Sequence, residues 1–251
     1  MSTYNYPQFP SANGYMTEKI RQKYLTGAIA NKLLPEHAHR MAKLVSLTAS
    51  NDPSQPIQFW QLYSVLGRDR IVALVENFYH RVYRDEAWFS SVFSRLADIR
   101  QHVGTQSAMW IDVMGGGQAY HGGEYRLSFH HTHNAIQLMN DKGAQRWVKL
   151  MLETLNDPSV DLTDDPRVRP SINTFLGHFF SKYAEDFKFA DTAAFGATNS
   201  PVKRKINFMT LSSDAIAALT EQELSDALVA KGVDISLYRS KDEMVNKALM
   251  L

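Results

Sequence analysis

Residues 115–136, with the sequence GGGQAYHGGEYRLSFHHTHNAI, are the stretch from which the fold is best inferred. The three glycines at 115–117 favour left-handed and extended backbone over helix, so a helix that precedes them must end there. A second glycine pair follows at 122–123, and His130, His131 and His133 then come almost together. Imidazole is the commonest metal ligand in proteins, and it suits iron, copper and zinc. The cluster therefore predicts a metal or haem site.

Composition narrows the class of protein. The 251 residues allow a core of about 120 to 150 residues with extensions. A net charge of +1, from 27 basic and 26 acidic residues, predicts no general attraction to nucleic acid. The lack of cysteine excludes disulfides, thiolate catalysis and covalent c-type haem attachment. No apolar run approaches the ~20 residues of a membrane span, and residues 1–15 lack the features of a signal peptide. We therefore expect a soluble protein of the cytoplasm or an organellar matrix.

Apolar residues recur at helical spacing along most of the chain. The pattern predicts a helix from Thr17, a second one from Pro35 through Val45, and a polar break at 48–56. From 57 to 187 helix follows helix, without sustained two-residue alternation, so the main domain is predicted to be all-α. We expect an N-terminal arm and helical extension at 1–56 and the main domain at 57–187.

One predicted helix of the main domain carries polar side chains on its apolar face. In the helix at 98–114, His102 and Gln106 interrupt the stripe formed by Val103, Trp110 and Val113. A buried polar group without a partner costs about 1–3 kcal/mol. His102 and Gln106 should therefore face either the surface or a cavity whose contents they bind.

The tail differs in composition from the main domain. Residues 188–205 are mostly small and polar, contain a basic run at 203–205, and are expected to form a linker. In residues 206–251, Thr220 with Glu223 and Ser240 with Glu243 match the capping-box pattern, and Gly232 follows the first of two predicted helices. These signals predict a small helix-loop-helix module that is similar to SAP-like modules. The basic run is more typical of a solvated surface than of a nucleic-acid contact.

Residues 63–155 resemble the truncated haemoglobins. Four stretches carry the resemblance in the family's order: VENFYHRVYRDEAWFSSVF at 75–93, MGGGQAY at 114–120, LSFHHTHNAI at 127–136 and RWV at 146–148. The chain departs from the pattern by Gly117 in place of proline, by about three extra residues between Ile136 and Trp147, and by a corner before Phe93 that is about one residue longer. The resemblance implies a two-over-two helical sandwich, here with extra helices at both ends.

The resemblance also implies a site for haem b (iron protoporphyrin IX). It makes His131 the proximal iron ligand, and His130 and His133 remain the alternatives in register. It places Tyr79, His102 and Gln106 as distal donors, or His102 as a sixth ligand. Phe93, Trp110, Phe129 and Trp147 would form apolar walls. A zinc or copper site without haem is disfavoured, because no nearby carboxylate or cysteine has evident spacing for a fourth ligand.

The leading functional hypothesis is a haem protein that binds dioxygen, nitric oxide or carbon monoxide. The roles that the family implies are oxygen binding and transport, ligand sensing, and oxidation of nitric oxide to nitrate, so enzyme activity stays open. The alternative is a haem-free globin fold that serves as a structural or assembly subunit and docks on protein partners through its extensions. In a third hypothesis, haem senses a gas and the C-terminal module transmits the result.

Overall fold

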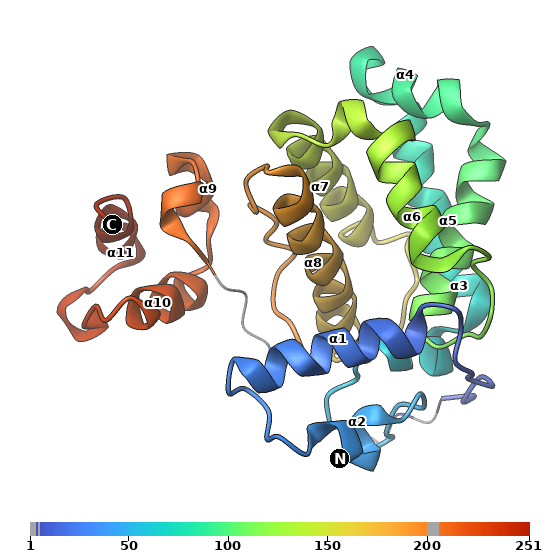
Figure 1. The fold of residues 1–251 in the computed structure, drawn as a ribbon, viewed down its shortest axis with the longest axis horizontal. Coiled ribbons are helices and arrows are strands. Elements are labelled where there is room, and N and C mark those ends of the chain that lie inside the picture. Colours follow the sequence, from blue (N-terminus) through green and yellow to red (C-terminus); the bar gives the residue numbers. More distant parts are fainter. Residues whose placement is uncertain (1–3, 5, 200–205) are drawn as a thin grey trace.

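The computed structural model describes residue 4 and residues 6–199 and 206–251. Every named element of secondary structure in these residues is a helix or a helical turn (Figure 1). The basic run at 203–205 lies outside the described residues. The α-helices are α1 Thr17–Ala30, α2 Ala42–Val45, α3 Leu62–Tyr83, α4 Ala87–Leu96, α5 Ile99–Val113, α6 Gly123–Phe129, α7 Asp141–Leu155, α8 Val168–Phe187, α9 Ser213–Ala218, α10 Glu221–Ala230 and α11 Lys241–Ala248. The short turns are η1 Ala38–Arg40, η2 Phe59–Gln61, η3 His130–Asn134, η4 Ile136–Leu138, η5 Phe208–Thr210 and η6 Ile235–Leu237. The prediction of an all-α fold is confirmed.

Local signals set the ends of the central helices. Asp98 caps α5 by accepting a hydrogen bond from the backbone N–H of Gln101 at 2.8 Å. The same helix ends at Val113, just before the glycines, as predicted. Gly115 has φ of 93° and Gly117 has φ of 89°, which is the left-handed region that glycine enters without steric cost. The chain therefore turns sharply between α5 and the segment that carries the three histidines.

The main core is built largely from side chains of α3, α5, α7 and α8. Helix α3 packs most extensively on α5 and then on α7, and it also contacts α8. Ile71, Leu74 and Val75 of α3 are almost completely buried. Among the described residues, no helix combines the length and the apolar character needed to cross a membrane.

The N-terminal extension belongs to the same core. Ile20, Tyr24 and Leu25 of α1 are buried with the residues of α3 and α8. The helix expected from Pro35 through Val45 is instead two short pieces, η1 and α2. The backbone carbonyl of Leu44 accepts from the indole N–H of Trp60 at 3.0 Å. Tertiary hydrogen bonds of this kind replace those of a longer helix.

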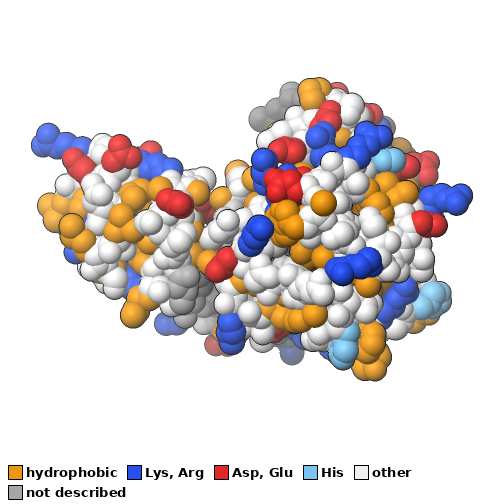
Figure 2. Space-filling view, turned by 90° about the horizontal axis from the view of Figure 1, so that it is seen from above, with side chains coloured by type: hydrophobic (Ala, Val, Ile, Leu, Met, Phe, Trp, Pro, Cys, Tyr) orange, Lys and Arg blue, Asp and Glu red, His pale blue; other side chains and the backbone are white. Residues whose placement is uncertain are grey.

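The C-terminal helices α9, α10 and α11 surround a small core of their own. The capping box of Thr220 and Glu223 is confirmed. In the second predicted box only half forms, because the Glu243 carboxylate accepts from the backbone N–H of Arg239 instead of Ser240. Figure 2 shows hydrophobic side chains on the surface of this module. The division of the chain at 56, 187 and 205 stays a prediction.

Candidate functional site

An apolar cavity opens between α3, α5, η3, α7 and α8. It leaves about 130 Å³ of space for water-sized molecules, and most of its lining is apolar. Seven residues singled out in the sequence line it: Tyr79, Phe93, Gln106, Trp110, His130, His131 and Trp147. The helices thus bring together side chains that are far apart in the sequence, such as Tyr79 and Trp147, which are separated by 68 positions.

The segment that carries the histidines changes helix type at the cavity. Helix α6 passes directly into the π-helical turn η3, where the backbone N–H of Ala135 donates to the carbonyl of His130 at 2.9 Å. Single π-helical turns within helices are rare and occur often at functional sites. This turn places both His130 and His131 at the cavity.

His131 is held in the form that a metal ligand needs. Its Nδ1–H donates to the backbone carbonyl of Leu127 at 2.8 Å, so Nε2 keeps its lone pair. Burial lowers the pKa of His131 to about 4, and the nearby imidazole of His130 adds to the effect. The ring is therefore neutral at pH 7 and can bind an electrophile through Nε2.

The two register alternatives lie in different places. The ring of His130 lines the cavity beside His131, with 5.2 Å between ring centroids and 82° between planes. His133 is exposed, and its ring stacks on Phe129 at 4.3 Å. Among the described residues, the cavity lining therefore includes His130 and His131 but does not include His133.

Phe129 does not form the apolar wall expected of it. Its side chain is 47 % exposed and lies outside the cavity lining. Successive residues of a helix turn by about 100°, so positions two apart point in nearly opposite directions. Leu127 and His131 share the inward face, and Phe129 and His133 consequently share the outward one.

Tyr79 and Gln106 present polar groups at the cavity wall. Tyr79 is only 6 % exposed, and neither its hydroxyl nor the Gln106 amide makes a hydrogen bond within the described part of the chain. Burial raises the pKa of Tyr79, with a contribution from the neighbouring hydroxyls of Tyr83 and Tyr120. The phenol is therefore neutral and free to donate to a molecule in the cavity.

His102 lies on the side of the Tyr79 ring that faces away from the cavity. Its ring stacks on Tyr79 with 5.4 Å between centroids and 11° between planes, and it is absent from the cavity lining. The hydroxyl of Tyr83 donates to the carbonyl of Ala97 at 2.6 Å, so the Nδ1–H of His102 donates to the Tyr83 oxygen at 2.5 Å. In this structure His102 supports Tyr79 and does not face the cavity directly.

Helix α8 supplies a cavity residue, Tyr183, that the sequence did not single out. The ring of Tyr183 packs on His131 with 4.2 Å between centroids, and its hydroxyl is buried without a partner among the described residues. Phe175, Phe179 and Phe180 line the same side. Their spacing of three and four residues signals an apolar face but does not show that the face borders a cavity.

The residues present fit haem better than a bare metal ion. No group of three or more His, Asp or Glu side chains in the described ranges could hold a metal ion by itself. The cavity instead offers aromatic walls and the half-buried imidazole of His131 with a free Nε2, together with polar groups at Tyr79 and Gln106 that lack partners among the described residues. That combination would suit a flat apolar cofactor whose metal takes an imidazole nitrogen as ligand.

Comparisons with known proteins agree with this geometry. A family model described as bacterial-like globin matches residues 61–199, which is more than half of the chain. Two-on-two hemoglobin-3 of Arabidopsis thaliana is 30% identical over 109 residues, which cover 43% of this chain and 61% of that protein. Group 2 truncated hemoglobin 3-1 of Lotus japonicus is 29% identical over 109 residues, which cover 43% of this chain and 63% of that protein.

The alignments with the two plant relatives cover only part of each protein. The aligned part spans less than two thirds of either plant relative, and no solved structure matches this chain. The family match nevertheless covers α3 to α8, which are the helices that build the cavity. The all-α core is a globin fold, and the chain belongs to the bacterial-like, truncated globin family.

Proposed function

We propose that this protein binds haem b through His131 and takes up a diatomic gas at the iron. One observation carries the proposal: a half-buried, neutral imidazole lines an apolar cavity, with Nδ1 engaged by a backbone carbonyl and Nε2 free. Membership of the globin family supports haem binding in general. When bound, the haem supplies an iron centre that accepts dioxygen, nitric oxide or carbon monoxide.

The chain's own residues would hold the group and retain the gas. The carbonyl of Leu127 fixes the His131 tautomer, and the aromatic lining excludes water. Tyr79 and Gln106 are the proposed donors to the gas. A hydrogen bond of about 1–3 kcal/mol slows escape of the gas by about 5- to 150-fold. His102 is proposed to act through Tyr79, because its ring backs that tyrosine.

Absorption spectroscopy of the purified protein tests the proposal. Haem is added in stoichiometric steps, the sample is reduced with dithionite, and carbon monoxide is introduced. We expect saturation at one haem per chain and a Soret band that shifts with carbon monoxide. Failure to take up stoichiometric haem would defeat the proposal and favour the haem-free scaffold that docks on partners through its extensions.

A pair of variants tests the ligand. His131→Gly should lose the native spectrum and recover it when free imidazole is added, because the small molecule can occupy the vacated space. His133→Gly is the matched control, and it should keep the native spectrum because His133 is exposed. If His131→Gly kept a native-like spectrum, the ligand assignment would pass to His130.

Gas transport, sensing and oxidation of nitric oxide are separate uses of the same site. An enzyme that oxidises nitric oxide should form nitrate when nitric oxide is added to the reduced protein under oxygen. A simple carrier should instead release its gas unchanged. The dissociation rate measured for each gas then decides which use its affinity permits.

A further inference from the structure

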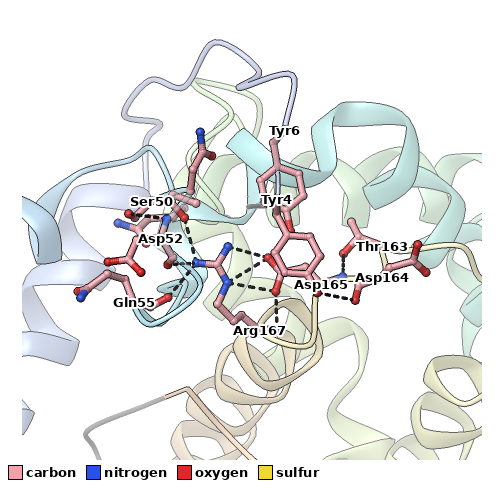
Figure 3. A network of polar contacts seen from close by, with 12 residues as sticks. Tyr4, Tyr6, Ser50, Asp52, Gln55, Thr163, Asp164, Asp165 and Arg167 are labelled. Carbon is pink, nitrogen blue, oxygen red and sulfur yellow. Dashed lines mark hydrogen bonds and ion pairs between the residues drawn. The ribbon is translucent and has the colours of Figure 1, made fainter. Parts of the chain in front are cut away.

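The segment of residues 6–16, here called the strap, is fastened to the globin core near both of its ends and at points between them. At its first end, the hydroxyl of Tyr6 donates to the carboxylate of Asp165, in the segment that leads into α8. Arg167 holds the same carboxylate through Nη2 at 2.7 Å (Figure 3). Its Nη1 also donates to the backbone carbonyls of Ser50, Asp52 and Gln55. Among the described residues, the hydrogen bonds of Tyr6 and Arg167 do not reach the segment that carries His131.

The second end is fastened by Asp112, near the end of α5. Its side chain is buried, with 0 % exposed. The carboxylate accepts from the backbone N–H groups of Tyr15 at 3.0 Å and Met16 at 2.8 Å, where the strap enters α1. It also accepts from the N–H of Tyr120 at 3.1 Å, in the loop that follows the glycines. A single buried carboxylate therefore joins the strap to the loop that leads to α6.

The strap also pairs directly with the glycines. Ala12 forms an isolated parallel bridge with Gly116. The N–H of Ala12 donates to the carbonyl of Gly115 at 2.9 Å, and the N–H of Gly117 donates to the carbonyl of Ala12 at 3.0 Å. Gly14 lies so close that a Cβ there would collide with the Asp112 carboxylate. The strap thus holds a backbone that glycine would otherwise leave free.

A third contact links α1 to α6 itself. Lys19 and Lys23 reach the carboxylate of Glu124 at 2.5 and 2.6 Å, in the first turn of α6. Both lysines are more than half exposed, so these ion pairs are expected to contribute little to stability. The buried contacts of Asp112 are the stronger tie.

We infer that Asp112 is a positioning residue for His131. By holding the glycine loop against the strap, it sets where α6 begins and hence where the imidazole lies in the cavity. Loss of this tie should let the loop and the histidine segment sample other arrangements. The coupling is reciprocal: a group that holds His131 in place should also protect the strap. Only this haem-dependent part rests on the proposed function.

Hydrogen exchange of the haem-free protein tests the inference without haem. Asp112→Asn replaces one accepting oxygen with an amide NH₂, which cannot accept. Tyr6→Phe is the matched control, since it releases only the first end of the strap. With Asp112→Asn we expect exchange at residues 115–134 to be about tenfold faster, and α7 to be unchanged. With Tyr6→Phe, faster exchange should stay within residues 6–10.

The haem-loaded protein provides the second readout. Asp112→Asn should shift the iron–histidine stretching band in the resonance Raman spectrum and speed haem loss, and Tyr6→Phe should change neither. Gly14→Ala, which keeps the carboxylate but crowds it, should act like Asp112→Asn. If Asp112→Asn speeds exchange equally everywhere, or leaves residues 115–134 unchanged, the inference is overturned. If the wild-type protein takes up no haem, the proposed function fails, and the exchange experiment still decides the role of Asp112.

Discussion

Replacing Tyr183 with phenylalanine should make the haem-free protein more stable. The Tyr183 hydroxyl lies in a part of the cavity wall that water does not reach, and it has no hydrogen-bond partner among the described residues. Burying a hydroxyl without a partner costs about 1–3 kcal/mol. Phenylalanine keeps the ring that packs on His131 and removes the oxygen. We expect the free energy of unfolding to rise by about 1–2 kcal/mol, after allowance for the small space left behind.

Tyr83→Phe is the matched control for this prediction. The Tyr83 hydroxyl donates to the carbonyl of Ala97 at 2.6 Å and accepts from the Nδ1–H of His102 at 2.5 Å. Its removal leaves a carbonyl and a ring N–H without partners, so this variant should lose about 1–3 kcal/mol. The two Tyr→Phe changes are chemically identical and should therefore have opposite signs.

Urea denaturation followed by tryptophan fluorescence measures both variants. All four tryptophans pack in or against the main core, so the signal reports that core and not the C-terminal module. A gain of about 1 kcal/mol corresponds to a rise of about 2–4 °C in the thermal midpoint of a chain of this size. If Tyr183→Phe were less stable than the wild-type protein, the hydroxyl would have a partner in solution, and the reasoning from its isolation would fail.

Three further predictions follow from the same structure. Tyr79→Phe should speed oxygen dissociation by about 5- to 150-fold in stopped-flow measurements, and an unchanged rate would remove Tyr79 from the gas site. Burial lowers the pKa values of His131 and His178 to about 4, so the unfolded chain binds more protons below pH 6.5. The free energy of unfolding of the haem-free protein should therefore fall by about 2 kcal/mol per histidine between pH 7 and pH 5. In urea titrations, His178→Phe should remove the part of this fall that is due to His178. Gly143→Ala should destabilise by about 1–3 kcal/mol, because its Cβ would meet a backbone carbonyl, whereas Gly177→Ala has open space and should stabilise by about 0.5–1 kcal/mol in the same titration.

The sequence by itself determined the features that depend on near neighbours in the chain. The stop of α5 at the glycines follows from backbone freedom that glycine has in any context. The capping box at Thr220 is a contact between residues three positions apart. The spacing of apolar residues predicted the helices of 57–187, α5 among them, because a helix places residues three and four apart on one face. The helices, and through the resemblance the globin core, could be predicted for this reason.

Only the tertiary structure decided how deeply each polar side chain lies and what it faces. The sequence favoured His131 and left His130 and His133 as alternatives in register, whereas the turn η3 and the packing of α8 bring the first two to the cavity and leave His133 exposed. His102 is on the expected face of α5, yet its bond to Tyr83 holds it behind Tyr79.

The tie between Asp112 and the strap shows the same limit most clearly. The carboxylate accepts from Met16, which lies 96 positions earlier in the chain. A contact over that separation leaves no local pattern in the sequence, because its energy depends on how α5, the glycine loop and α1 come together in space. The sequence therefore specified the helices and the residues whose side chains can bind a ligand. The packing of the helices decided which of those residues share a site.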